Sequence, residues 1–491
     1  MIKTCYYIYM KKNIISPLLR NRIFRVVFVA ALIVGGIVIY QNWPDGTCRN
    51  CNVILISVDT LRADHMGVYG YSKDTTPNID RWAKEATVFT NAYTIVPLTF
   101  HSFYTLMTGK KDAFEKNSMG VSYINVDNQK TNIATLAKIL KTNNFYTVAF
   151  VSNPVVGELN EFFADGFDFF KFFDITNSSD YFSREIFKHE YENAKSITYS
   201  AKKWLTNKPK NNFYLWLHYN VTHGPYNPQL KYLCLIDKNC KDPKYIRLIE
   251  QSSNLSGCNN LPKDKEDLIK LQNLYDAEIL STDEQIGEIL STLKKNNLFN
   301  NTIVIFYGDH GEGFDHNISN HGYSLYNSEI HIPLIIYYPH AYHKKNVTQI
   351  IDNSDILPTL LSLLKINYAQ YVLKGEDLST TLKSNKQAGN PLTKYIYSRT
   401  PINYSASYSI INGSFKYIYT TPENRCNQDQ PNEELYNLKL DPNEKNNIIN
   451  SNNLIKQKLK KILTEKIGEK TEDNSNLDDK KNVEKLKSLG Y

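Results

Sequence analysis

Short apolar runs rich in β-branched and aromatic residues recur along this chain of 491 residues and constrain its fold most strongly. Such runs are typical of strands that are buried on both faces of a parallel sheet. The runs are Asn52–Ser57, Phe145–Ser152, Phe213–His218, Thr302–Tyr307 and Ile332–Tyr338. Helical patterns lie between them, at Asn132–Lys141 and over the longer Leu271–Lys295. This alternation predicts an α/β domain with a mostly parallel sheet flanked by helices.

Three stretches depart from the alternation. Asn227–Asp264 is polar and Lys-rich and holds three cysteines, so we expect an inserted surface loop held by disulfides. From about Asn390 the chain is tyrosine-rich with alternating polarity, as in Tyr404–Tyr419, which predicts a small antiparallel sheet. The tail Asp441–Lys485 is rich in Asn and Lys and is expected to be helical in part.

The formal net charge of +7 originates at the N-terminus, where the first 25 residues hold six Lys or Arg and no acidic residue. The uncharged run Val26–Tyr40 follows, and with its apolar flanks it is long enough for one bilayer span. A basic N-terminal flank favours a cytoplasmic N-terminus. We therefore expect a single-pass helix over 26–43 and a periplasmic or cell-surface body. A cleaved signal peptide is the alternative, but no small-residue cleavage site follows the run.

One cysteine precedes the predicted span and six follow it. An even number in an oxidising compartment fits up to three disulfides. Cys48 and Cys51 form a C-x-x-C pair, but a second pair at zinc-finger spacing does not occur. Structural disulfides are therefore predicted, and their pairing stays open.

Acidic and histidine residues stand just beyond the carboxyl ends of three predicted strands. Asp59 follows the first strand, His218 and His223 end and follow the third, and Asp309 and His310 follow the fourth. In an open α/β sheet, ligands bind at this edge. Carboxylates with imidazoles suit a hard or borderline divalent cation. The sequence therefore predicts a site for one cation, either Ca²⁺, Mg²⁺, Mn²⁺ or Zn²⁺.

Longer segments around these residues resemble the sulfatase family of the alkaline-phosphatase-like superfamily. The segments, in the family's order, are Ser57–Tyr71, Thr76–Asp80, Asn91–Thr94, Tyr307–His316, His321–Ile336, Asp355–Leu364, Glu434–Glu444 and Leu486–Tyr491. The resemblance runs from about Asn52 to Tyr491 and implies an alkaline-phosphatase-like fold with hydrolase activity toward esters.

The resemblance also implies roles for individual residues. Metal ligands of the family match Asp59, Asp309 and His310, whereas Thr60 stands where a second Asp is common. His223 resembles the active-site His that donates to the leaving-group oxygen. His321 falls within about one position of a basic residue that contacts the transferred group.

The nucleophile segment departs from the family. Sulfatases carry a Cys that is oxidised to formylglycine, whereas this segment reads TFHSFYTLMTGK and has Thr99 at the Cys position. A Thr hydroxyl can act as a nucleophile when a cation and a helix N-terminus lower its pKa. Superfamily members with a Thr nucleophile usually transfer phosphoryl groups. The structural alternative is that Thr99 only caps a helix expected over Phe103–Met107.

We therefore predict a membrane-anchored, extracytoplasmic, metal-dependent hydrolase of phosphate or sulfate esters. Its substrate would be a small molecule or an ester on an envelope glycan or lipid. A phosphoethanolamine or phosphoglycerol transferase and a catalytically silent binding protein are the alternatives. Nucleic acid is not expected as a partner, because the body beyond the basic segment carries a net charge of only +1. The predicted parts are a cytoplasmic segment (1–25), the span (26–43), a catalytic domain (44–389, insertion 227–264) and a C-terminal subdomain with tail (390–491).

Overall fold

The computed structural model describes residues 48, 51–111, 133–157, 161–173, 190–207, 209, 212–255, 257–339, 341, 345–383, 394–400, 407–422 and 430–468. The predicted segments 1–25, 26–43 and 486–491 lie outside these residues. Among the described helices, none combines the length and the apolar character that a bilayer crossing requires.

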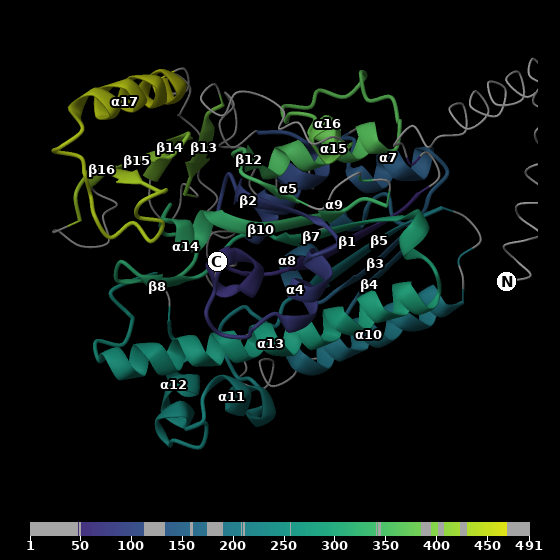
Figure 1. Cartoon of the computed structure of the whole chain (residues 1–491), viewed down its shortest axis with the longest axis horizontal. Coiled ribbons are helices and arrows are strands. Elements are labelled where there is room, and N and C mark those ends of the chain that lie inside the picture. Colours follow the sequence, from purple (N-terminus) through teal and green to yellow (C-terminus); the bar gives the residue numbers. More distant parts are fainter. Residues whose placement is uncertain are drawn as a thin grey trace, which may run out of the picture. The chain divides into compact units, whose positions relative to one another are not determined.

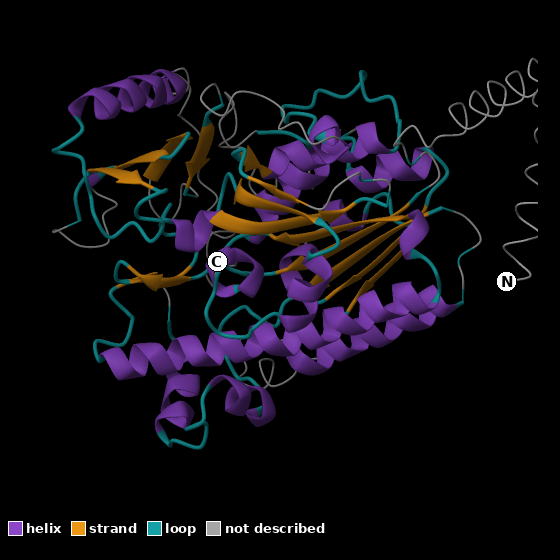
Figure 2. Ribbon diagram, viewed as in Figure 1, coloured by secondary structure: helices purple, strands orange, loops and turns teal. Residues whose placement is uncertain are grey.

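The central sheet has nine strands among the described residues, in the order β11-β2-β10-β7-β1-β5-β3-β4, with β12 beside β2 (Figures 1 and 2). The strands are β1 (Asn52–Val58), β2 (Thr87–Tyr93), β3 (Tyr146–Val151), β4 (Phe169–Phe172), β5 (Phe213–Tyr219), β7 (Thr302–Gly308), β10 (His331–Tyr337), β11 (Lys345–Val347) and β12 (Ile351–Asp352). The five predicted strands are confirmed to within one residue at each end. Strand β10 runs antiparallel to β7 and β2, and the other pairings are parallel, so the sheet is mixed and mostly parallel.

The register of β1 against its two neighbours determines which residues meet at the carboxyl edge. Val58 at the end of β1 pairs with Tyr219 of β5 and with Gly308 of β7. The next residue of each strand is polar: Asp59, Asn220 and Asp309, all buried. Because the three strands are parallel, these side chains leave the sheet at the same edge.

Helices cover both faces of the sheet (Figures 1 and 2). Alternate residues of β1 point to opposite faces, as a strand requires: Val53 and Leu55 join one core cluster, and Ile54 and Ile56 join the other. The first cluster includes α5 (Thr99–Thr108), α7 (Leu136–Thr142) and α15 (Ile356–Leu363). The second includes α4 (Pro77–Ala83), α10 (Glu190–Thr206) and the long α13 (Lys265–Lys295). Shorter helices are α8 (Pro154–Gly157), α9 (Glu161–Ala164), α14 (Asn327–Ile330) and α16 (Ser379–Lys383), with 3-10 turns η2 (Ala63–His65), η3 (Gly67–Tyr69), η7 (Phe299–Asn301) and η8 (Asn353–Asp355).

The predicted C-terminal antiparallel sheet is present. It contains β13 (Ile396–Arg399), β14 (Ser407–Asn412), β15 (Phe415–Thr420) and β16 (Glu433–Asn437), and α17 (Asn453–Gly468) packs on it. Helix α17 confirms that the Asn- and Lys-rich tail is helical in part. A second small sheet joins β6 (Gly257–Cys258), β9 (Ile318–Asn320) and β8 (Gly313–Asp315).

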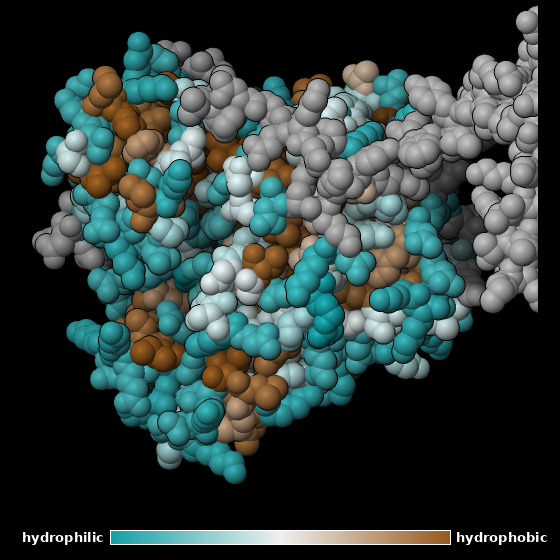
Figure 3. All heavy atoms as spheres, viewed as in Figure 1, coloured by the Kyte–Doolittle hydropathy of each residue, from teal (hydrophilic) through white to brown (hydrophobic). Residues whose placement is uncertain are grey.

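The insertion at 227–264 was expected to be a loop, and this expectation was wrong. It forms α11 (Leu230–Ile236) and α12 (Lys244–Ser252), whose apolar residues, among them Leu233 and Leu248, join the same core cluster as α13. Each helix is only two or three turns long, too short for its 3.6-residue period to stand out among the lysines. On the outer side Leu235 and Ile246 are exposed, and apolar atoms gather over this part of the molecule in Figure 3.

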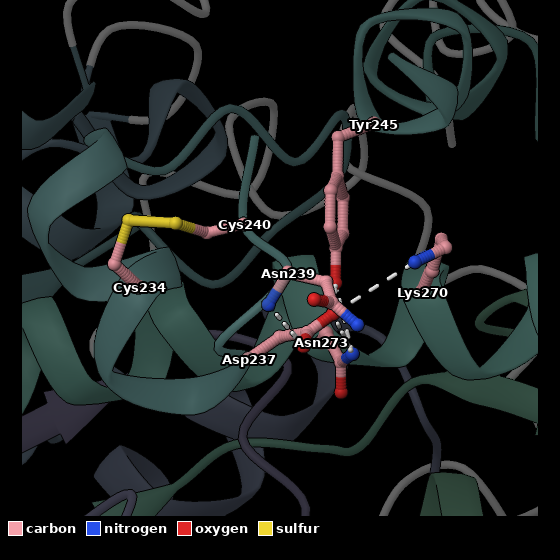
Figure 4. The surroundings of a disulfide bond; sticks show 7 residues. All are labelled: Cys234, Asp237, Asn239, Cys240, Tyr245, Lys270 and Asn273. Atoms are coloured by element: carbon pink, nitrogen blue, oxygen red, sulfur yellow. Dashed lines mark hydrogen bonds and ion pairs between the residues drawn. A yellow bond between two sulfur atoms is a disulfide. The ribbon is translucent and has the colours of Figure 1, made fainter. Parts of the chain in front are cut away.

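Disulfides stabilise this body as predicted, and the structure now gives pairings. Cys48 bonds to Cys51, Cys234 bonds to Cys240, and Cys258 is disulfide-bonded as well. Figure 4 shows how the Cys234–Cys240 loop meets α13: Tyr245 donates a hydrogen bond to Asp237 (2.6 Å), and Asn273 of α13 donates one to the Tyr245 hydroxyl (2.9 Å).

Candidate active site

Two fully buried carboxylates form the centre of the candidate site. The Thr60 backbone N–H donates to Asp309 Oδ1 (3.1 Å), and so does the His310 N–H (2.8 Å). The Asn153 side-chain amide donates to Asp59 Oδ2 and, at 2.9 Å, to Asn220 Oδ1. Asp59 Oδ1 and Asp309 Oδ2 are buried without a hydrogen-bond partner among the described residues. Burial raises the pKa of Asp59 to about 6. Burial, and next the charge of Asp59, raise the pKa of Asp309.

These orphaned oxygens fit a cation, because two buried carboxylates would otherwise repel each other without compensation. His310 Nε2 lies 3.7 Å from Asp59 Oδ1 and 3.7 Å from Asp309 Oδ2. Ligand atoms of a four-coordinate metal site lie about 3.3–3.6 Å from one another, so the three predicted ligands have suitable spacing. His218 adds another imidazole, since Asp59, His218 and Asp309 each offer a ligand atom within 4.8 Å of the others.

Thr99 lies in the first turn of α5, directly beside this group. The helix N-cap is Leu98 and Thr99 is the first helical residue, so the interpretation of Thr99 as a mere cap was wrong. Its Oγ1 is 3.3 Å from His310 Nε2. The His310 Nδ1–H donates to the Gly311 carbonyl (3.0 Å), which leaves Nε2 to accept from the Thr99 hydroxyl.

Helix α5 is anchored at this edge by Ser102, one turn after Thr99. Ser102 Oγ donates to the Asp309 carbonyl (2.7 Å) and lies 2.5 Å from the Tyr307 hydroxyl. Asn353 Nδ2 donates to the Ser102 carbonyl (3.2 Å). The same strand that carries Asp309 therefore fixes the helix that carries Thr99.

Two further histidines line the half-buried side of the site. The His223 Nδ1–H donates to the Gly224 carbonyl (2.6 Å), and the ring centroid lies 5.1 Å from that of His321. His321 Nδ1 is 3.2 Å from Glu312 Oε1, and its ring centroid is 4.3 Å from that of His310. The sequence-predicted residues Asp59, Thr99, His223, Asp309, His310 and His321 therefore gather in one site.

The sequence analysis overlooked Asn153 and Asn220. Both follow strand ends, β3 and β5, so the rule that located Asp59 would have found them had amides been considered with carboxylates. Arg62 has a structural role next to the site. Its guanidinium donates two hydrogen bonds to Asp64 (2.9 and 2.8 Å) and forms an ion pair with Asp315 (3.3 Å).

The fold and the site together define an α/β protein in which buried carboxylates and imidazoles at the carboxyl edge of the sheet could hold a cation. The sequence profile of the family described as Sulfatase matches residues 51–366, and a second profile, described as N-sulphoglucosamine sulphohydrolase, C-terminal, matches residues 316–473. Because the first match covers more than half of the chain, the protein belongs to the sulfatase family, whose members are sulfuric ester hydrolases.

Relatives and solved structures agree with this membership. The chain is similar to an arylsulfatase of Clostridium perfringens, with 25% identity over 461 residues that cover 82% of this chain and 90% of the relative. It is also similar to an N-acetylglucosamine-6-O-sulfatase of Bacteroides thetaiotaomicron, at 24% identity over 81% of this chain and 82% of the relative. The structure of a phosphonate monoester hydrolase of Agrobacterium radiobacter shares the fold, with a TM-score of 0.65, 18% identity and coverage of 85% and 96%.

Proposed function

We propose that this sulfatase-family hydrolase cleaves phosphate and sulfate monoesters with Thr99 as the nucleophile. The observation that carries the proposal is the position of the Thr99 hydroxyl, in the first turn of α5 and 3.3 Å from His310 Nε2. His310 in turn lies against both carboxylates. Asp59, Asp309 and His310 would hold the cation, which when bound stabilises negative charge on the Thr99 oxygen and on the ester oxygens.

The remaining residues have separate tasks in this proposal. The Thr99 hydroxyl passes its proton to a water molecule that enters the site with the substrate, and its oxygen bonds to phosphorus or sulfur as the bond to the leaving oxygen breaks. His223 fits the general acid that donates to the leaving oxygen, because its Nδ1–H donates to the Gly224 carbonyl and so fixes the ring beside His321. Water then cleaves the Thr99 ester and restores the hydroxyl. His321, held by Glu312, fits a contact to the transferred group.

The test is turnover of p-nitrophenyl phosphate and p-nitrophenyl sulfate by the full chain with added Mn²⁺, Ca²⁺ or Zn²⁺. Thr99→Ala should lose about 10³-fold or more in kcat, whereas Thr99→Ser should keep measurable turnover because it keeps a hydroxyl. Thr108→Ala, on the last turn of the same helix, is the matched control and should retain kcat. Unchanged turnover in Thr99→Ala would contradict the assignment of the nucleophile.

We also propose that the enzyme is anchored by residues 26–43 with its body outside the cytoplasm. The basic segment and apolar run of the sequence support this topology. Disulfides in the body support an oxidising compartment. The full chain should stay in the membrane fraction after alkaline extraction, and protease added outside the cytoplasmic membrane should degrade the body. A body that survives such protease until the membrane is lysed would contradict the topology.

A further inference from the structure

His218 is fully buried at the end of β5, and its hydrogen bonds assign its tautomer. Ser57, its cross-strand neighbour on β1, donates its hydroxyl proton to the Leu217 carbonyl (3.1 Å). Ser57 Oγ accepts from Trp216 Nε1–H (2.9 Å) and lies 3.0 Å from His218 Nδ1. Since the only proton of the hydroxyl is already donated, His218 Nδ1 must be the donor in that contact. Its Nε2 therefore carries a lone pair.

That lone pair faces a carboxylate. His218 Nε2 is 3.8 Å from Asp59 Oδ2 and has no hydrogen-bond partner among the residues that the structure describes. A buried lone pair directed at a carboxylate oxygen is unfavourable unless a cation or a donor lies between them. His310, two residues after β7, repeats the arrangement, because its Nδ1–H donates to the Gly311 carbonyl and its Nε2 faces both carboxylates.

Packing does not account for this arrangement. The His218 ring contacts Phe103 (centroids 4.9 Å apart) and Trp216 (6.0 Å), which explains an aromatic ring at this position. A phenylalanine would make the same contacts and leave no buried nitrogen without a partner. The histidine therefore needs a role for Nε2.

We propose that His218 is a ligand of the bound cation, oriented by Ser57, and that the site is selective for a transition-type metal such as Mn²⁺ or Zn²⁺ over Ca²⁺ and Mg²⁺. The donor set becomes two carboxylates and two imidazoles, with the Thr99 hydroxyl adjacent. Imidazole nitrogen binds Zn²⁺ and its first-row neighbours well, whereas Ca²⁺ and Mg²⁺ take oxygen ligands. Ser57 acts as the outer-shell partner that fixes the ring nitrogen, as metal-binding histidines usually require. This inference rests on the proposed cation site.

The experiment is calorimetric titration of the metal-stripped full chain with Mn²⁺, Zn²⁺, Ca²⁺ and Mg²⁺ in separate runs. Wild type should bind Mn²⁺ or Zn²⁺ at least about tenfold more tightly than Ca²⁺. His218→Phe keeps the ring packing and should lower the affinity for Mn²⁺ and Zn²⁺ by more than about 100-fold. This loss is larger than the one expected for an outer-shell partner. Ser57→Ala keeps the imidazole but removes the hydrogen bond that orients it, so its metal affinity should fall by about 10–100-fold. His331→Gln, at a half-buried histidine of β10 outside the group, should bind metal as wild type does.

A spectroscopic measurement separates ligation from stability. Electron spin echo modulation of the Mn²⁺-loaded chain should report two coordinated imidazole nitrogens in wild type and one in His218→Phe, with circular dichroism as the check on folding. Unchanged metal affinity and unchanged nitrogen modulation in folded His218→Phe would overturn the inference alone. A wild type that prefers Ca²⁺ would overturn the proposed selectivity. A wild type that binds none of the four cations would overturn both the inference and the proposed cation site.

Discussion

Thr60 is the residue whose backbone the site depends on most directly. It has φ = +49°, which is uncommon for a β-branched residue, and its N–H donates to Asp309. Tyr275, fully buried on α13, donates from its hydroxyl to the Thr60 carbonyl (2.7 Å) and accepts from the Arg62 N–H (2.9 Å). Tyr275 thus stabilises, through the Thr60 carbonyl and the Arg62 N–H, the unfavourable backbone conformation that directly follows Asp59.

Replacing Tyr275 with Phe should therefore affect stability and metal binding together. The change leaves a buried carbonyl and a buried N–H without partners, which costs about 1–3 kcal/mol in the free energy of unfolding. The loosened turn should also weaken cation affinity. Urea denaturation and metal titration measure the two effects. Tyr214→Phe, at a buried tyrosine whose hydroxyl contacts only the Met107 sulfur (3.8 Å) in the described structure, is the control. Equal effects of the two substitutions would contradict this role.

At the scale of elements, the carboxyl edge of the sheet could be predicted because it depends on few residues. Each buried strand is visible as an apolar run, and the residue after it is visible as a polar one, so Asp59 and Asp309 follow from the pattern. The bond between Ser57 and His218 could not be predicted, because it depends on β1 lying beside β5 in one particular register. The start of α5 was predicted four residues late, because Thr99, His101 and Ser102 obscure the helical period.

Helix α13 carries a buried carboxyl, Glu278, that bonds to the start of the insertion and makes the stability of the fold depend on pH. Glu278 Oε1 accepts from the backbone N–H of Asn227, the first residue of the insertion (3.0 Å). Burial, and next the charge of Glu190, raise the pKa of Glu278 to about 8, although its hydrogen bonds act in the opposite direction. In the unfolded chain a Glu titrates near ~4.3. The folded protein therefore retains a proton that the unfolded chain has already lost between these two values.

The stability that this proton contributes is complete below the unfolded pKa and is lost as the pH rises through about 8. Between these limits the slope approaches about 1.4 kcal/mol per pH unit. Glu278→Gln should remove this part of the pH dependence. The free energy of unfolding of the variant should therefore increase relative to that of wild type as the pH rises from 5 to 8. Urea denaturation at three pH values measures the gain. Glu250→Gln, at an exposed position of α12, should show no such gain, and parallel behaviour of the two variants would contradict the prediction.

For the whole molecule, a buried ion pair between Lys416 and Glu444 of the C-terminal part connects the C-terminal sheet to the catalytic core through hydrogen bonds with Leu325 and Asn327. Lys416 Nζ of β15 lies 2.6 Å from Glu444 Oε1, and it donates to the Leu325 carbonyl (2.8 Å) and to Asn327 Oδ1 (2.9 Å). Glu444 Oε2 accepts from the Asn327 backbone N–H (2.5 Å). These contacts connect the segment that begins at His321 to residues 89 to 117 positions later.

Lys416→Met should therefore destabilise the protein by about 3–5 kcal/mol, because it leaves the Glu444 carboxylate buried and unpaired. Adding Glu444→Gln to the same chain should recover part of the loss, since the unpaired charge is removed. Lys460→Met, which breaks a surface pair with Glu433, should cost no more than about 1 kcal/mol. Equilibrium unfolding in urea compares the three, and a loss in Lys416→Met as small as that in Lys460→Met would contradict the prediction.

The hydrogen bond between Asn327 and Glu444 can form only after both residues have been synthesised. Its two residues are 117 positions apart, so the acceptor leaves the ribosome about 6–23 seconds after the donor at ordinary rates of synthesis. Throughout that interval the nascent chain contains Asp59, Thr99, Asp309 and His310 but cannot yet secure the loop after His321. A folding helper that meets the nascent chain therefore handles an intermediate in which the segment after His321 lacks this bond until Glu444 has been synthesised.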